Sequence, residues 1–336
     1  MDLKKVLLIL MTILIFTSSV SLLADDIRGY FIPEYYVVAS NNSEELSDQH
    51  GFWIRRLYIG YNTDLGDGWS ARVRLEMDSS PFEKDSIVPY LKNLHIKKKL
   101  SSGVSLILGI IEPPSFDKIE KFWGFRYIEK TPPDFWKFAS SRDFGVALDG
   151  KTKRGIVYTL MYGNYSSNKG ETNSGKAVYG RVGYERRNIY VEINTHFADD
   201  GGKNKNFASV FAGLKGNWGR FGAGFNYYSE KSVDSEKKDN GIISAFGVIK
   251  LSEKSRIFAR YDLLSDLNFK DISGYLPVPA STNLAGLFIA GLNIDISKHI
   301  KISPNVKYVH YLNSELKGEF YLNLTGKIFF KTKFGK

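Results

Sequence analysis

Residues 69–78 read WSARVRLEMD, and in this stretch apolar and polar side chains alternate at nearly every position. One face of an extended chain carries the apolar set, which is Trp69, Ala71, Val73, Leu75 and Met77. The other face carries the polar set, which is Ser70, Arg72, Arg74, Glu76 and Asp78. Because successive side chains of a strand point to opposite faces, this period of two predicts a β-strand with one apolar and one wettable face.

The same alternation recurs in about sixteen segments between Ile27 and Phe334. The predicted strands are 27–40, 51–63, 69–79, 89–99, 104–112, 142–151, 155–165, 176–187, 189–199, 206–216, 220–230, 240–252, 255–266, 283–296, 300–311 and 318–334. Most run about ten to fourteen residues, whereas strands of soluble sheets are commonly about five to six residues long. Pro33 and Pro304 fall inside predicted strands, and we expect each to mark a bulge or a position near a rim.

The connections between these segments alternate in length. Every second joint is short, such as LGDG at 65–68, and the joints between are longer and polar, such as SSNKGETNSG at 166–175. In an antiparallel chain this places all short turns at one end and all long loops at the other, as in a transmembrane antiparallel β-barrel. A soluble sandwich or propeller is the alternative, but the Arg, Lys, Glu and Asn on the polar faces do not suit a sandwich core.

The first 24 residues have the three-part layout of a secretory signal peptide. Lys4 and Lys5 precede an apolar run over 6–16, and small residues follow up to Ala24. The apolar run is too short to span a bilayer, and no later stretch approaches twenty apolar residues, so a helical membrane protein is excluded. We expect cleavage after Ala24, with Ser21 as the alternative, a single barrel domain over 25–336, and export to the bacterial outer membrane.

The composition limits the chemistry and the partners. The chain has 336 residues, no cysteine, 14% aromatic residues and a formal net charge of +10. The lack of cysteine excludes disulfides and thiolate metal sites. A positive excess favours anionic partners, and for an exported protein we expect small anionic solutes and outer-membrane lipid rather than nucleic acid. No metal-ligand spacing, phosphate loop or dinucleotide fingerprint is present, so neither a metal nor a cofactor is expected.

One long connection departs from the pattern. Residues 112–142 read EPPSFDKIEKFWGFRYIEKTPPDFWKFASSR, with eight aromatic residues and the cations Lys118, Lys121, Arg126, Lys130 and Lys137 before Arg142. A barrel of about sixteen strands is too wide for its side chains to fill. We therefore expect residues of about 113–141 to fold inward as a constriction loop, with the aromatics packed on the barrel wall. An ordinary external loop is the alternative, against which so many aromatic side chains argue.

The polar faces of the predicted strands also carry many cations. They are one of Arg55 and Arg56, then Arg72, Arg74, Lys97, Arg181, Arg187, Arg256, Arg260, Lys301, Lys307, Lys327 and Lys331. Rings of Arg and Lys in a pore select anions, although many of these cations are expected to pair with lumenal carboxylates. The predicted anion path consists of Arg55, Arg56, Arg72, Arg74, Lys118, Lys121, Arg126, Lys130 and Lys137.

Three stretches resemble the phosphate-selective porin O/P family. GFWIRRLYIGYNTDLGDGWSARVRLEMD (51–78) is similar to its early strand pair, SGVSLILGIIEPPSF (102–116) to the entry into its constriction loop, and SSRDFGVALDG (140–150) to the strand that follows. The resemblance implies a sixteen-stranded barrel, usually a trimer, with the loop after the fifth strand folded into the lumen. Selective members of the family have a lysine ring and an arginine ladder. In this sequence the positions that match these features are limited to Arg55, Arg56 and the loop cations.

These patterns favour a passive, water-filled, anion-preferring diffusion channel for small solutes, such as phosphate or other oxyanions. A non-selective general porin and an adhesion or structural barrel are the alternatives. An enzyme needs a nucleophile and a base within hydrogen-bond reach, and only His196 with Asp199 and Asp200 is suggestive. We predict that the protein is not an enzyme and has no catalytic residues.

Overall fold

The computed structural model describes residues 25–79, 87–232, 237–265, 285–311 and 315–334. Within these ranges the strands are β1 (Asp25–Ser40), β2 (His50–Gly66), β3 (Trp69–Asp78), β4 (Tyr90–Ser101), β5 (Val104–Ile111), β6 (Asp143–Lys151), β7 (Ile156–Gly163), β8 (Ala177–Arg186), β9 (Ile189–Asp199), β10 (Lys203–Gly216), β11 (Gly219–Ser232), β12 (Lys238–Lys250), β13 (Ser255–Leu264), β14 (Ala285–Asp295), β15 (Ile300–Tyr311) and β16 (Glu319–Phe334). The predicted boundaries agree with these to within three residues. The predicted signal peptide, residues 1–24, lies outside the described residues.

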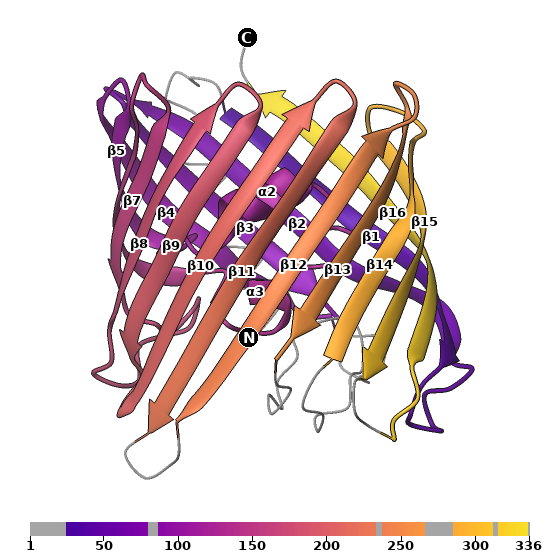
Figure 1. Ribbon diagram of the computed structural model, residues 1–336. Coiled ribbons are helices and arrows are strands. Elements are labelled where there is room, and N and C mark those ends of the chain that lie inside the picture. Colours follow the sequence, from indigo (N-terminus) through magenta and orange to yellow (C-terminus); the bar gives the residue numbers. More distant parts are fainter. Residues whose placement is uncertain (1–24, 80–86, 233–236, 266–284, 312–314, 335–336) are drawn as a thin grey trace, which may run out of the picture.

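The strands form one closed antiparallel barrel (Figure 1). Each strand pairs with its neighbours in the chain, and β1 pairs with β16 to close the ring. Closure satisfies backbone N–H and C=O groups within the sheet, which a wall in contact with hydrocarbon requires. The expectation of about sixteen strands in a transmembrane-type barrel is confirmed for the described part of the chain.

The two ends of the barrel differ as expected. The turns that join β2 to β3, β4 to β5 and each later even-numbered strand to its successor have two to four residues. All of them lie at the upper end in Figure 1. At the lower end the connection from β9 to β10 has three residues, and the connections from β1 to β2 and from β7 to β8 have nine and thirteen. We call the upper end the short-turn end.

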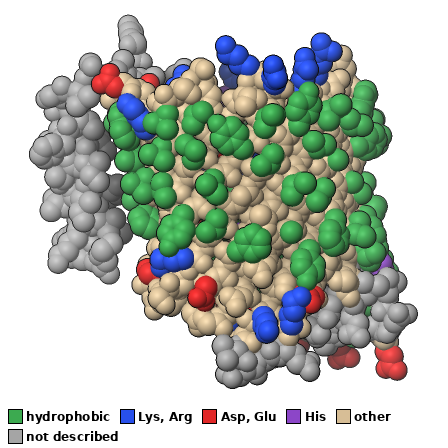
Figure 2. Space-filling model, turned by 60° about the vertical axis from the view of Figure 1, so that its left-hand side comes forward, with side chains coloured by type: hydrophobic (Ala, Val, Ile, Leu, Met, Phe, Trp, Pro, Cys, Tyr) green, Lys and Arg blue, Asp and Glu red, His purple; other side chains and the backbone are tan. Residues whose placement is uncertain are grey.

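The burial of side chains is inverted relative to a soluble protein. Val182 is 63% exposed and Ile193 61%, whereas Glu76, His196 and Asp262 are fully buried. Figure 2 shows a band of apolar side chains over the middle of the barrel wall, with charged side chains concentrated above and below it. An apolar exterior and a polar interior is the arrangement of a barrel whose wall faces lipid.

A bulge at Pro33 brings two arginines into the barrel. Where β1 pairs with β2, Ile32 lies opposite Arg56, and the next residue, Pro33, lies opposite Ile54. Arg55 therefore has no opposite residue in β1 and is an extra residue in β2. Both arginine side chains are therefore buried inside, where we had expected only one of them. Pro304 lies in a regular ladder, because the register between β15 and β16 does not shift there, so no bulge marks this position.

Two short helices interrupt the connection between β5 and β6, namely α2 (Asp117–Trp123) and α3 (Pro132–Phe135). Gly124 ends α2 in the left-handed conformation, with a φ of 74°. In Figure 1 both helices lie within the outline of the barrel. No helix in the described ranges is long and apolar enough to cross a membrane.

Candidate functional site: the lumen and the segment that crosses it

Residues 112–142, which we call the lumenal segment, touch opposite walls of the barrel. On one side, the Arg55 Nη1 of β2 donates hydrogen bonds to the carbonyl oxygens of Tyr127 and Ile128, at 3.0 and 2.7 Å. On the other, the ring of Phe122 lies 5.6 Å from that of Phe211 in β10. Because β2 and β10 are eight positions apart in a ring of sixteen strands, they face each other. The lumenal segment therefore crosses the interior.

Aromatic side chains attach the lumenal segment to the wall. The ring centroids of Trp123 and Phe246 are 5.0 Å apart, and those of Phe125 and Phe258 are 4.4 Å apart. All four side chains are buried. Offset and edge-to-face aromatic pairs contribute roughly 0.5–1.5 kcal/mol each beyond the area they bury. The expected packing of these aromatics against the barrel wall is confirmed by these contacts.

Glu129 is the main charged anchor of the lumenal segment. Its Oε2 lies 2.8 Å from the Lys307 Nζ and 3.8 Å from the Arg55 Nη2. Burial raises the pKa of Glu129, but Lys307 and Arg55 outweigh this effect and hold the pKa at about 2. The carboxylate is therefore ionised at neutral pH and ties β2 and β15 to the middle of the lumenal segment.

Other charges of the lumenal segment are also engaged in its own structure. Arg126 donates to Glu120 and to Asp134, each at 2.8 Å. Lys130 is buried, and this burial lowers its pKa to about 8 although Asp134 opposes the change. These contacts engage both cations within the lumenal segment, and their part in the anion path stays a prediction.

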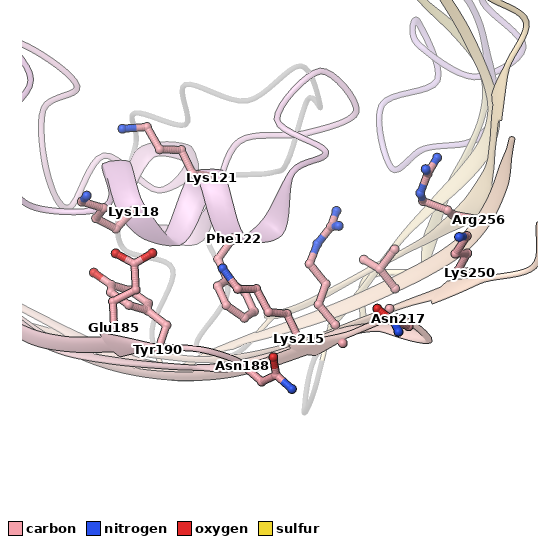
Figure 3. Close-up of a pocket in the computed structure, with 14 residues that line it drawn as sticks. Lys118, Lys121, Phe122, Glu185, Asn188, Tyr190, Lys215, Asn217, Lys250 and Arg256 are labelled. Atoms are coloured by element: carbon pink, nitrogen blue, oxygen red, sulfur yellow. The ribbon is translucent and has the colours of Figure 1, made fainter. Parts of the chain in front are cut away.

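Two cavities lie on the short-turn side of the lumenal segment, one on each side of α2. The first has a volume of about 570 Å³ and is lined by residues of β8 to β13 (Figure 3). The second has a volume of about 460 Å³ and is lined by residues of β1 to β8. Lys118 and Lys121 of α2 line both cavities. The two cavities therefore share one cationic edge.

The first cavity is strongly cationic. Its lining contains six cations, which are Lys118, Lys121, Lys215, Arg220, Lys250 and Arg256. Its only carboxylate among the described residues is Glu185, which is 2.9 Å from Lys151. Figure 3 shows Lys118 and Lys121 extending from α2 on one side, with Lys215, Lys250 and Arg256 on the wall strands. No described carboxylate forms an ion pair with Lys118, Lys215 or Arg220.

The second cavity has a smaller positive excess. Its cations are Arg28, Arg72, Lys97, Lys118, Lys121 and Arg181, and its carboxylates are Glu112, Asp117 and Asp149. Arg181 pairs with Asp117, which fixes the start of α2 to β8. The Nε of Arg72 donates to the amide oxygen of Asn62 at 2.7 Å, and no described carboxylate forms an ion pair with Arg72. A surplus of positive charge thus remains after pairing.

The structure divides the predicted anion path into two groups. Arg72, Lys118 and Lys121 line the cavities, and Arg74 lies at 4.0 Å from the cavity residue Glu112. Arg55, Arg56 and Lys130 are instead buried, with Arg56 at 2.6 Å from Glu76. Arg126 is partly exposed and pairs with Glu120 and Asp134. Lys137 is exposed, has a φ of 55°, and lines neither cavity.

Sequence reasoning missed three cations of the first cavity, namely Lys215, Arg220 and Lys250. Lys215 and Arg220 lie in the glycine-rich stretch 213–224, which connects β10 to β11. The signal was present in the alternation, because Lys215 lies on the same face of β10 as the buried Phe211.

His196 does not form the suspected catalytic cluster. Its buried ring packs among Tyr165, Tyr179 and Phe207, with centroids 5.3 to 5.5 Å away. Neither ring nitrogen has a hydrogen-bond partner in the described part of the chain. Asp200 pairs instead with Lys205, at 2.7 Å. Among the described residues no group of three or more His, Asp or Glu side chains is placed to hold a metal ion.

No protein-family model and no curated protein matches the chain. Solved structures do match it in fold. One is an anion-selective porin from Comamonas acidovorans, with a TM-score of 0.69, 12% identity, and coverage of 91% of this chain and 99% of that chain. Another is the outer membrane channel DcaP of Acinetobacter baumannii, with a TM-score of 0.63, 10% identity and coverage of 91% and 97%.

A mutant of the Rh. blastica porin matches with a TM-score of 0.58, 16% identity and coverage of 91% of this chain and 100% of that chain. The chain therefore has the fold of the outer-membrane porins, a closed antiparallel barrel of sixteen strands. The more specific resemblance to the phosphate-selective porin O/P family remains a prediction.

Proposed function

We propose that this protein is an outer-membrane porin that forms a passive, water-filled channel and prefers small anions, phosphate or other oxyanions among them. The observation that carries the proposal is the cationic lining on both sides of α2, with six cations and one carboxylate around the first cavity. Fixed positive charges raise the local concentration of anions and offset the hydration that an ion loses. One structure with a similar fold is named an anion-selective porin, which supports the proposed preference for anions.

In this proposal the lumenal segment is the constriction. It crosses between β2 and β10 and leaves two cationic cavities beside α2. Lys118 and Lys121 then act on solutes in both passages, because they line both. Arg72 and Arg74 extend the positive lining along β3.

Three further features complete the proposal. The first 24 residues direct export and are removed, the barrel resides in the bacterial outer membrane, and three copies assemble as a homotrimer. The layout of the barrel supports the second of these, because its wall is apolar outside and polar inside. Catalysis plays no part in the proposed function.

A planar bilayer experiment with purified protein tests the ion preference. With about tenfold more KCl on one side, we expect single channels whose reversal potential has the sign of chloride preference. Lys118→Gln combined with Lys121→Gln removes two charges shared by the cavities, and we expect the potential to move towards zero. Lys231→Gln, an exposed position of β11 at the far end, serves as the control.

The outcomes separate the alternatives. A reversal potential near zero in the wild type identifies a non-selective general porin and refutes the anion preference. A potential of the opposite sign refutes it as well. Absence of any conductance from correctly folded protein refutes the channel and leaves the adhesion or structural barrel.

A further inference from the structure

The short-turn end of the barrel carries far more positive than negative charge. We counted the residues of the seven short turns together with the last residue of the strand before each turn and the first residue of the strand after it. These positions hold eight cations, which are Lys151, Lys153, Arg154, Arg186, Arg187, Lys250, Lys254 and Lys298. The same positions hold three carboxylates, which are Asp67, Glu253 and Asp295. Glu253 pairs with Lys250, and Asp295 pairs with Arg256 and Lys301. The carboxylates are thus largely occupied.

Four of these cations lie on two neighbouring turns, and we call them the basic rim: Lys153, Arg154, Arg186 and Arg187. The turns are adjacent because the Glu185 N–H donates to the Gly155 carbonyl oxygen at 2.8 Å. All four side chains are exposed, and no described carboxylate forms an ion pair with any of them. Like charges placed together repel one another, so an anion bound between them would relieve the repulsion.

The apolar surface of the barrel begins directly beside the basic rim. Ile156 follows Gly155 and is 44% exposed, and Ile189 follows Asn188 and is 46% exposed. Two tryptophans lie at the same end: Trp69 at the start of β3, and Trp218 in the turn before β11, 47% exposed. Tryptophan favours the boundary between hydrocarbon and head groups. The basic rim therefore lies at the level where lipid head groups meet the wall. Figure 2 shows Lys and Arg side chains above the apolar band of the wall.

The long-loop end carries carboxylates as well as cations. Glu44, Glu45 and Asp48 are exposed in the connection from β1 to β2, and three lysines at this end are paired with carboxylates. Lys176 lies 3.0 Å from Glu171, Lys205 lies 2.7 Å from Asp200, and Lys237 lies 2.9 Å from Asp239. The charge of the short-turn end is therefore a local feature of the protein and does not simply repeat its overall basic composition.

We propose that the basic rim binds the phosphodiester head groups of anionic phospholipids in the leaflet that surrounds the short-turn end. Guanidinium groups form paired hydrogen bonds with phosphate oxygens, and clustered Lys and Arg at a membrane surface attract anionic lipid. The proposal rests on the barrel being embedded in a membrane, but it does not depend on the ion preference of the channel.

The test measures which lipids stay with the protein. Full-length purified protein is reconstituted in nanodiscs of phosphatidylcholine and phosphatidylglycerol, transferred to mild detergent, and examined by native mass spectrometry. We expect about fivefold or greater retention of phosphatidylglycerol over phosphatidylcholine, since each surface cation contributes on this scale. Raising the salt to about 1 M should weaken the preference, because it screens exposed charges.

Two matched variants locate the site. Lys153→Gln, Arg154→Gln, Arg186→Gln and Arg187→Gln together remove the four charges of the basic rim. Four exposed lysines at the long-loop end provide the control with an equal charge change, by substitution to Gln at Lys169, Lys203, Lys231 and Lys238. The first variant should lose the preference to within about twofold, and the control should keep it. Heat-dependent mobility in gels and β-type circular dichroism confirm folding of each.

Should the four-site variant fail to fold, the pairs Lys153/Arg154 and Arg186/Arg187 are substituted separately, and each pair should lose part of the preference. Equal retention of the two lipids by the wild type overturns the proposal and leaves an acidic protein as the partner of the basic rim. A preference that survives in the rim variant, or that falls equally in the control, overturns it too. Loss of conductance would bear only on the proposed channel function.

Discussion

Lys307 on β15 and Glu129 in the lumenal segment form an ion pair that is buried inside the barrel, with the Nζ 2.8 Å from the Oε2. Both side chains are at most 1% exposed. Arg55 on β2 approaches the same carboxylate, at 3.8 Å. One carboxylate in the lumenal segment therefore connects two strands on either side of the barrel's closing strands.

We predict that Lys307→Met destabilises the protein by ~3 kcal/mol, because it leaves a buried carboxylate short of a partner. Urea unfolding of the reconstituted barrel measures the change. Lys250→Met is the matched control, since Lys250 pairs with Glu253, whose side chain is 88% exposed, and an exposed pair contributes at most about 1 kcal/mol. Equal effects of the two substitutions would contradict the anchoring role of Lys307.

Ionisation of the same carboxylate should make the stability of the fold depend on pH. The pKa of Glu129 is about 2 in the folded protein, against an ordinary value of 4.5. A lowered pKa means that the ionised group stabilises the fold fully above its ordinary pKa, and that this stabilisation is lost as the pH falls towards the folded value. The stability difference between wild type and Glu129→Gln should therefore shrink between pH 5 and pH 2.

Thermal unfolding at a series of pH values measures this difference. Glu315→Gln provides a control, because Glu315 is an exposed carboxylate outside the lumenal segment, and its difference from wild type should stay small at each pH. A wild-type advantage over Glu129→Gln that is the same at pH 2 and pH 5 would show that ionised Glu129 is not the anchor.

Close packing between Gly213 and Phe122 predicts a steric effect. A Cβ at Gly213 of β10 would lie 2.6 Å from the Cε1 and Cζ atoms of Phe122. The ring is confined by Tyr190, Phe211 and Phe246, so Gly213→Ala should displace the lumenal segment and cost ~1–3 kcal/mol. Unfolding and single-channel conductance should both change.

Gly180→Ala is the control for this substitution in a strand. The nearest atom to its new Cβ is the Thr195 Cγ2, at 3.9 Å, which is ordinary contact. We expect a change below about 0.5 kcal/mol and unaltered conductance. Wild-type conductance in Gly213→Ala would mean that the position of Phe122 does not control the passage.

The missed cation Lys215 should contribute to ion preference. It lines the first cavity, and no described carboxylate pairs with it. We predict that Lys215→Gln lowers the ratio of chloride to potassium permeability by about twofold, because it removes one unpaired charge from the lining. Lys238→Gln, at the exposed start of β12, should leave the ratio unchanged. A ratio unaffected by Lys215→Gln would exclude this cavity from the ion path.

The strands were predictable because their signal is local. In β9, Ile189, Val191 and Ile193 alternate with Tyr190 and Glu192, and the structure exposes the first set and buries the second. Each position shows by its own residue type which side of the wall it faces, because positions facing lipid are apolar and positions facing the lumen are mostly polar. The bulge at Pro33 was also predictable, because proline has no N–H for the ladder.

The roles of individual cations were not predictable in the same way. Arg55 and Lys118 both belonged to the predicted anion path, yet Arg55 is buried against Glu34 and Glu129 whereas Lys118 lines both cavities. Their sequence neighbourhoods do not reveal this difference, because the partners of Arg55 lie 21 and 74 positions away. Pairing depends on which strands and loop residues meet across the lumen.

Alternation and turn length are enough to predict a closed barrel of about sixteen strands and to single out residues 112–142, because both signals act between near neighbours. Two findings required the folded chain: the lumenal segment reaches from β2 to β10, and certain cations have no carboxylate partner among the described residues. Electrostatic pairing depends on distance in space, and closure of the barrel brings together charges that are remote along the chain.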